Sequence, residues 1–394
     1  MIDVSIIDHC VAEQGRFCVI DWLLSDDLLS YSDYESWRYG DQKVLEKLLR
    51  LDGVSLESLL GNIDKQCRAL ELMAEAKDFY RWDQDQKVSL KLCENHQQDR
   101  QMAQTWFRPQ DRPQMDLFMD NSAQIVENAV LENLDNRSFE QALSQLQTLS
   151  ELNPQNTRLG SYQDLINYGM HMQANPEIPQ ASLGPELLGF EQEVLPLANE
   201  ILGSVARDYI ASAWRRFAKS MQGHPFDPLQ PNRHASSVLL KIPDYDSAIN
   251  CLKTVGDLYH QAVLLERLAI SYGATHHIDS ALVVWCLLME HDADYAERSI
   301  QQLQPHYLLT IWQDYLEFNE SALAQYFSAF VLLKRPGLIH LLDKFPPLKL
   351  PASIAMSELL SLRASGGDEI ESRRSLQSIS PELLSIYLSQ LERS

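Results

Sequence analysis

A segment of 34 residues in the C-terminal third carries the most regular hydrophobic pattern of the chain. It reads LLERLAISYGATHHIDSALVVWCLLMEHDADYAE and spans residues 264–297. Apolar residues recur at helical spacing on both sides of a short polar break, which indicates two consecutive helices. The small residues Ala269 and Ala281 stand where two packed helices would approach most closely. The pattern therefore predicts a helical hairpin.

Two other segments repeat parts of this pattern. Residues 138–154, SFEQALSQLQTLSELNP, place Ala142 at the offset that Ala281 has in the first segment. In residues 244–255, DYDSAINCLKTV, Ala248 lies 33 residues before Ala281, close to the ~34-residue period of tetratricopeptide repeats. Over about 120 residues the chain thus resembles a degenerate tetratricopeptide (TPR-like) helical-repeat protein. The resemblance implies stacked helical hairpins and names no reaction.

Composition favours helix throughout the chain. Glycine is scarce, 15 of 394 residues against a usual share of about 7%. The segments between prolines are rich in Leu, Ala, Gln and Glu, which are good helix formers. A chain of this length has room for two or three domains. We predict an all-α fold of stacked antiparallel helical hairpins (TPR-like, an α-solenoid) with an N-terminal helical bundle.

Breaks rich in proline or glutamine divide the chain into blocks. Residues 197–221 are predicted to form one long helix that bridges two lobes. Ser380 and Pro381 mark the start of a final helix whose apolar stripe includes Leu384 and Leu388. The predicted blocks are an N-terminal helical block (1–97), a Gln/Pro-rich connector (98–122), a helical region with a TPR-like hairpin and the bridging helix (123–221), a Pro-rich break (222–236) and a C-terminal helical-hairpin region (237–394).

The acidic balance of the chain bears on its partners. Asp and Glu number 55 against 33 Lys and Arg, for a net charge of −22. This charge repels phosphate backbones, so we expect no nucleic-acid partner, and it steers a basic protein segment toward the surface. Acidity also keeps a protein soluble without any partner. No stretch reaches the ~20 apolar residues of a membrane span, so we expect no membrane insertion and a cytoplasmic location.

Motifs for chemistry are missing from the sequence. It holds neither HExxH nor GxSxG, and neither GxxxxGK[ST] nor GxGxxG. Its six cysteines form no CxxC pair, which predicts reduced thiols and no disulfides. The neighbours His276 and His277 are expected to close the turn between two helices instead of binding metal. We therefore predict no cofactor and no metal site.

Two clusters of aromatic and basic residues are candidate partner-binding sites. In the first, Tyr34, Trp37 and Arg38 share one helical face at i, i+3 and i+4. Tyrosine, tryptophan and arginine are the residue types preferred as interface anchors. The alternative is that this face packs on the N-terminal bundle.

The second cluster is a basic spot in an acidic chain. It contains Trp214, Arg215 and Arg216, with Lys219 close behind. Such a group can bind a protein partner, a carboxylate or a phosphate. The alternative is that its arginines pair with the chain's own acidic residues.

Helical hairpins without reaction motifs favour a non-catalytic intracellular scaffold or adaptor, which binds a protein partner through a helical-repeat surface. A basic segment is the expected complement to its charge. One alternative is an enzyme or enzyme accessory subunit with a site in the loop from His224 to His234, which also contains Asp227 and Arg233. Another is a structural subunit of a larger assembly, contacted through the N-terminal block.

Overall fold

The computed structural model shows a mostly helical chain that forms two compact units. Unit 1 comprises Met1–Met221 and Lys241–Asp244, and unit 2 comprises Gln222–Leu240 and Tyr245–Ser394. The chain leaves unit 1 after Met221, where the sequence indicated a Pro-rich break. The structure describes residues 2–26, 28–51, 53–82, 88–109, 122–203, 206–318 and 324–391.

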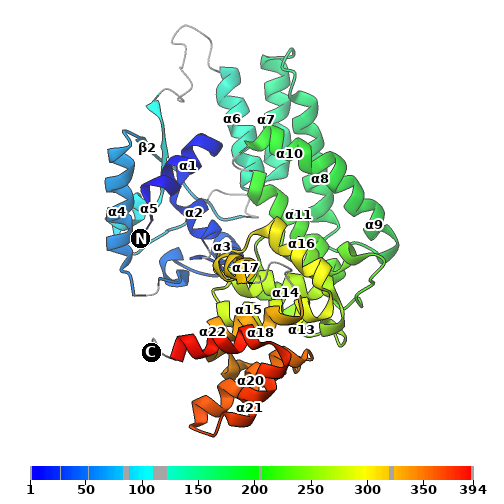
Figure 1. Cartoon of the computed structure of the whole chain (residues 1–394). Helices are drawn as coiled ribbons and strands as arrows, with labels where there is room; N and C mark the ends of the chain where they lie inside the picture. Colours follow the sequence, from blue (N-terminus) through cyan, green and yellow to red (C-terminus); the bar gives the residue numbers. More distant parts are fainter. Residues whose placement is uncertain are drawn as a thin grey trace. The chain divides into compact units, whose positions relative to one another are not determined.

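The first half of unit 1 combines helices with a small antiparallel sheet (Figure 1). The sheet has the strand order β1-β3-β2, and Trp106 of the central strand pairs with Phe17 on one side and Ala74 on the other. The elements are α1 (Val4–Gln14), β1 (Phe17–Cys18), α2 (Val19–Ser25), α3 (Tyr31–Arg38), the 3₁₀ helix η1 (Leu45–Leu48), α4 (Leu56–Ala69), β2 (Met73–Ala76), α5 (His96–Met102) and β3 (Gln104–Phe107).

The sheet is the main departure from the all-α prediction. Its strands are two to four residues long. Alternation of apolar and polar residues needs a longer run to be recognised, so the strands left no periodic pattern in the sequence. Helix α5 and strand β3 lie in the first part of segment 98–122, for which the sequence indicated a connector; residues 110–121 lie outside the described residues.

The second half of unit 1 is helical. Consecutive helices pack side by side, α6 on α7 and α7 on α8. Residues 197–221 do not form the single bridging helix that was predicted, because Gly203 adopts a φ of 53° and ends the first of two helices. The elements are α6 (Ser122–Asp135), α7 (Phe139–Leu152), α8 (Leu159–Ala174), α9 (Gln180–Gly189), a π-helical turn (Phe190–Val194), α10 (Leu195–Leu202) and α11 (Ala206–Met221).

Unit 2 contains the predicted hairpin, formed by α14 and α15, which pack closely on each other. Both Ala269 and Ala281 are fully buried, and His276, with a φ of 57°, lies in the turn as expected. The many packed neighbouring helix pairs are compatible with helical repeats. The elements are η5 (Pro231–Arg233), α12 (Ala235–Leu239), α13 (Tyr245–Lys253), η6 (Leu258–His260), α14 (Ala262–Ala274), α15 (Ile278–His291), α16 (Ala293–Leu303), α17 (His306–Phe318), η7 (Ala324–Tyr326), α18 (Phe327–Lys334), η8 (Pro336–Leu338), α19 (Ile339–Leu342), α20 (Pro351–Ser365), α21 (Ile370–Ile379) and α22 (Pro381–Leu391).

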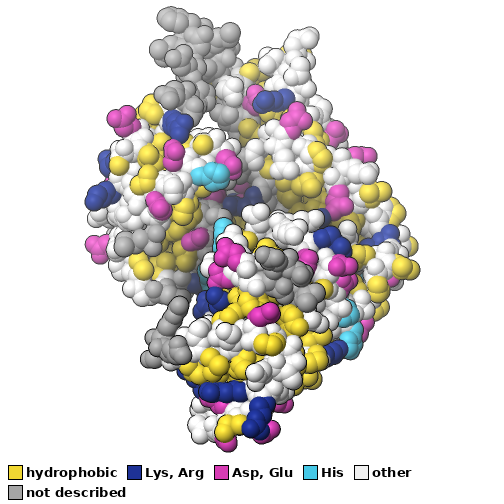
Figure 2. Space-filling view, viewed as in Figure 1, with side chains coloured by type: hydrophobic (Ala, Val, Ile, Leu, Met, Phe, Trp, Pro, Cys, Tyr) yellow, Lys and Arg dark blue, Asp and Glu magenta, His cyan; other side chains and the backbone are white. Residues whose placement is uncertain are grey.

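Helix α22 begins where the sequence predicted. The backbone N–H of Leu383 donates to the Ser380 hydroxyl at 3.3 Å. The buried stripe is rotated from the predicted one, because Leu383 is buried with Leu384, whereas Leu388 is 37% exposed. Figure 2 shows acidic and basic side chains interspersed over the visible face.

Gly169 allows helices α7 and α8 to approach closely. A Cβ at this position would lie 2.3–2.6 Å from ring atoms of Phe139 on α7, whereas a Cβ at Gly160 of the same helix would meet nothing within 4 Å. We predict that Gly169→Ala lowers the free energy of unfolding by about 1–3 kcal/mol through overpacking. Gly160→Ala should leave it unchanged or raise it by up to ~1 kcal/mol.

Urea denaturation followed by circular dichroism measures both variants against the natural chain. Because the two glycines share one helix, any general effect of alanine on helix propensity is present in both. Equal effects of the two substitutions would contradict the close approach of α7 and α8 at Gly169.

Candidate functional site

Helix α11 lines two cavities of unit 1 with opposite faces. Residues three or four apart share a face of a helix, and each cavity is lined by one such set. The first cavity is lined by Ile210, Ala211 and Trp214, and the second by Ser212, Arg215, Arg216 and Lys219.

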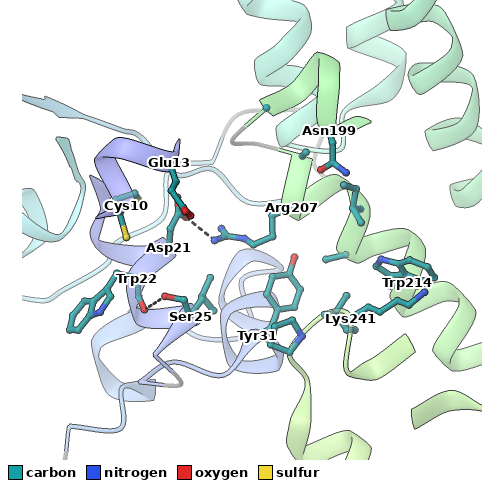
Figure 3. A pocket seen from close by; sticks show the side chains of 18 of the residues that line it. Cys10, Glu13, Asp21, Trp22, Ser25, Tyr31, Asn199, Arg207, Trp214 and Lys241 are labelled. Carbon is teal, nitrogen blue, oxygen red and sulfur yellow. Dashed lines mark hydrogen bonds and ion pairs between the residues drawn. The ribbon is translucent and has the colours of Figure 1, made fainter. Parts of the chain in front are cut away.

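The first cavity has a volume of about 890 Å³ and lies between α1–α2 and α10–α11 (Figure 3). Its wall is mainly apolar and includes four aromatic side chains, those of Phe17, Trp22, Tyr31 and Trp214. Trp22 is buried, and its indole N–H has no hydrogen-bond partner among the described residues. The cavity therefore offers mainly apolar surface, and the unpaired indole nitrogen is itself enclosed by the protein.

The charged groups of the first cavity are already paired within unit 1. Arg207 Nη1 donates to Asp21 Oδ1 at 2.8 Å, as the dashed line in Figure 3 marks. Lys241 pairs with Glu191 of the π-helical turn, and its Nζ lies 4.2 Å from the centroid of the Trp214 ring. The lining itself holds Glu13 and Asp21 against Arg207 and Lys241, so the wall is close to neutral.

Two thiols line the first cavity, and neither is activated. Burial, with the Asp21 and Glu13 carboxylates, raises the pKa of Cys10. Burial and Asp21 likewise raise the pKa of Cys18. The thiolate is the reactive form of cysteine, so a raised pKa makes both thiols poor nucleophiles at neutral pH.

A buried ion-pair network begins at Asp208 of α11, beside the first cavity. The Tyr34 hydroxyl donates to Asp208 Oδ2 at 2.8 Å, and Arg38 Nη1 lies 3.6 Å from the same oxygen. Burial alone would raise the pKa of Asp208, but the guanidinium groups of Arg207 and Arg38 outweigh it and hold this pKa well below its ordinary value. Asp208 is therefore ionised although it is only 3% exposed.

The structure places the first candidate cluster inside unit 1. Tyr34, Trp37 and Arg38 are buried, and Arg38 is 0% exposed. Trp37 Nε1 donates to the carbonyl of Lys91 at 2.9 Å, and Arg38 Nη2 donates to Asn136 Oδ1 at 3.1 Å. In this conformation the cluster makes internal packing contacts, which was the alternative interpretation, and it presents almost no surface to a partner.

The second candidate cluster is divided between the two cavities. Trp214 packs edge-on against Phe190, with ring centroids 4.8 Å apart, and lines the first cavity. Arg215 and Arg216 line the second cavity. Arg215 pairs with Glu35 at 2.6 Å and with Asp244, and Arg216 pairs with Glu186 at 2.8 Å. The arginines thus pair with the chain's own acidic residues and also border a cavity.

Arg137 and Asp208 connect these two clusters, and neither was identified as a candidate residue from the sequence. Arg137 lies in the α6–α7 turn with a φ of 58°, and its guanidinium stacks on Trp82 at 3.5 Å from the ring centroid. It donates to the Tyr39 hydroxyl at 2.6 Å and to the Asp208 carbonyl at 3.0 Å. The only sequence signal was the charged pair Arg207–Asp208 inside a predominantly apolar segment, which indicates buried charges.

The loop from His224 to His234, which was the alternative enzymatic site, does not bring its titratable side chains together around His234. His234 is buried at the start of α12, 3.9 Å from Cys251 Sγ. Burial and the Arg267 guanidinium lower the pKa of His234 to about 4, while burial raises the pKa of Cys251. The pair is therefore a neutral imidazole and a neutral thiol. Among the described side chains, neither His224, Asp227 nor Arg233 makes a hydrogen bond or ion pair to His234.

No family model matches the chain, and neither a curated protein nor a solved structure matches it. Within the described ranges, no three His, Cys, Asp or Glu side chains lie close enough together to hold a metal ion. The helices of that part of the chain all fall short of the length and apolarity that a bilayer span requires. A functional proposal therefore rests on the two cavities beside α11.

The Asp208 network makes a strong contribution to stability. Replacing one partner of a buried pair leaves an uncompensated charge, which costs about 3–5 kcal/mol. We predict that Asp208→Asn lowers the free energy of unfolding by about this amount, because Arg38 and Arg207 stay buried without their carboxylate. Urea denaturation followed by tryptophan fluorescence measures it.

Glu177→Gln is the matched control. It removes a carboxylate whose partner, Lys219, is also largely exposed. Surface pairs of this kind contribute about 0–1 kcal/mol. An Asp208→Asn variant as stable as Glu177→Gln would show that the buried network is not a stabilising element.

His234 makes unit 2 sensitive to mild acid. An unfolded histidine has a pKa of ~6.5, so between that pH and the folded pKa of about 4 the unfolded chain binds a proton that the folded chain does not. Stability is full above pH ~6.5 and is lost as the pH falls toward 4. We predict that the free energy of unfolding of His234→Gln falls less between pH ~6.5 and 4 than that of the natural chain. Urea titrations at several pH values measure this difference. His224→Gln should keep the natural pH profile, and identical profiles for both variants would contradict the assignment.

Proposed function

We propose that the chain is a non-catalytic scaffold or adaptor that binds a protein partner, and that the first cavity of unit 1 receives an apolar anchor from that partner. The wall of this cavity carries the proposal: about 890 Å³ of space lined mainly by apolar and aromatic groups. Cavities of ~300–1,000 Å³ with such walls bind by burying apolar surface. Large apolar anchors in pockets provide most of the affinity of protein interfaces.

The ionisable groups of the cavity support binding over catalysis. A general acid or base works best with a pKa near the operating pH. The pKa values of Cys10, Cys18 and Tyr31 are instead raised by burial, which keeps all three groups protonated at neutral pH. Asp21 and Arg207 neutralise each other. A wall without an activated group suits a site that holds a ligand without transforming it.

The partner segment we propose is apolar at its centre and basic at its flanks. The net charge of −22 attracts a basic segment and accelerates its association.

The proposal also covers the role of unit 2 and the cellular compartment of the protein. We propose that hairpin α14–α15 belongs to a degenerate TPR-like array that provides further contact surface, as packed neighbouring helices support. The six cysteines are all free, which supports a reducing compartment such as the cytoplasm.

Asn199 and Glu200 allow a matched test of the first cavity. Both are exposed residues of α10, but only Asn199 lines the cavity. We predict that Asn199→Trp, which blocks the opening, weakens partner binding at least about tenfold, equivalent to losing one interface anchor. Glu200→Trp should bind as the natural chain does.

The partner is identified by placing a photo-crosslinking residue at position 199 and sequencing the crosslinked peptide by mass spectrometry. Binding of that peptide to the two tryptophan variants is then measured by calorimetry at low and moderate salt. We expect a peptide with an aromatic or aliphatic centre and Lys or Arg flanks, bound more weakly as salt rises. Equal binding by Asn199→Trp and Glu200→Trp would remove the cavity from the proposal.

A further inference from the structure

The second cavity has a strongly cationic wall in an otherwise acidic chain. It encloses about 620 Å³ beside the α7 N-terminus, and Glu140 is the one acidic residue of its described lining. The carboxylates that pair with its cations, from Glu35, Asp244, Glu186 and Glu177, are not part of that lining. The cationic residues of the lining are Arg137, Arg215, Arg216 and Lys219.

Helix α7 adds backbone donors to this wall. Phe139 and Glu140 form the start of the helix and line the cavity. The first N–H groups of a helix have no partner within it, and the Ser138 side chain does not cap them. The helix dipole adds a partial positive charge at the same end. Anions bind at such positions when cationic side chains assist.

One side chain of the cavity wall has a buried donor that is not hydrogen-bonded within the described part of the protein. Arg137 lines the cavity and is 4% exposed. Its two Nη groups donate to the Tyr39 hydroxyl and the Asp208 carbonyl, but its Nε–H has no acceptor among the described residues. Buried polar groups are almost always hydrogen-bonded, so this nitrogen, which the surrounding protein encloses, would gain an acceptor when a ligand in the cavity draws the side chain toward it.

We propose that the second cavity binds the phosphate group of a small molecule. Donors reach it from α11, from the α6–α7 turn and from the start of α7, and a tetrahedral phosphate can accept from several directions at once. A planar carboxylate accepts mainly from one fork of donors. The space exceeds a single phosphate and lies in the ~300–1,000 Å³ range of small-molecule sites. Met172, Gln173 and Ser212 also belong to the cavity wall, where an organic moiety would lie.

This site is separate from the first cavity and goes beyond the proposed function. Its ligand is a small anion, whereas the first cavity is proposed to take an apolar anchor. Residues of α11 that line one cavity do not line the other. A failure to bind phosphate would therefore leave the adaptor proposal intact, and the reverse is also true.

Lys219 and Lys65 provide the test. The Lys219 side chain is 58% exposed and lines the cavity, so Lys219→Glu reverses its charge without disturbing the core. Lys65, on an exposed position of α4, undergoes the same charge change outside the cavity in Lys65→Glu. Thermal unfolding of the full chain is followed with increasing inorganic phosphate, acetate or glucose 6-phosphate at one constant ionic strength.

We expect a saturable rise in Tm with phosphate, as binding to the folded state requires, and a smaller rise with acetate. Lys219→Glu should raise the Kd for phosphate at least about tenfold, whereas Lys65→Glu should keep the natural value. If glucose 6-phosphate binds more tightly than phosphate, the remaining volume of the cavity holds the organic part of the ligand. If the two bind equally, the ligand is free phosphate. No saturable shift, equal binding of acetate, or equal Kd values for the two variants would overturn the proposal.

Discussion

The ionised carboxylate of Asp208 is the constraint on which unit 1 depends. A buried charge is tolerated only with close counter-charges and hydrogen bonds, and Asp208 obtains them from Tyr34, Arg38 and Arg207. These contacts connect α11 to α3, and Arg137 connects the α6–α7 turn to the Asp208 carbonyl. Both cavities are lined by α11, so the network that positions this helix also determines where each cavity lies.

Local patterns predicted the helices well, and long-range contacts account for what was missed. Hairpin α14–α15 was recognisable because its small and large residues recur at helical spacing within 34 residues. The Tyr34–Asp208 hydrogen bond joins residues 174 positions apart, and no periodicity records such a pair. Strand β1 is only two residues long and exists because β3 pairs with it from a distant part of the chain.

The sequence predicted which residue types make up the candidate site, but it did not predict which of these residues are buried and which line a cavity. Tyr34, Trp37 and Arg38 were identified from composition and spacing, yet their exposure depends on Asn136 in the α6–α7 turn and on Asp208 in α11. Arg215 and Arg216 were predicted from the sequence to form a basic spot, but Arg137, which lines the same cavity and has a buried unpaired donor, was not identified. A turn residue with positive φ has no sequence signature when it is an arginine.

An acidic chain can keep a cationic cavity because the carboxylates that pair with its arginines lie outside the cavity lining. Glu35, Asp244 and Glu186 hold Arg215 and Arg216 in place, while the cavity wall itself presents the guanidinium groups. The remaining negative charge is screened beyond about 8–10 Å in physiological salt. A single phosphate inside the cavity would sense mainly the near cations. A nucleic acid would extend over the acidic surface, so the charge distribution that we propose admits a small phosphorylated molecule would disfavour a polyanion.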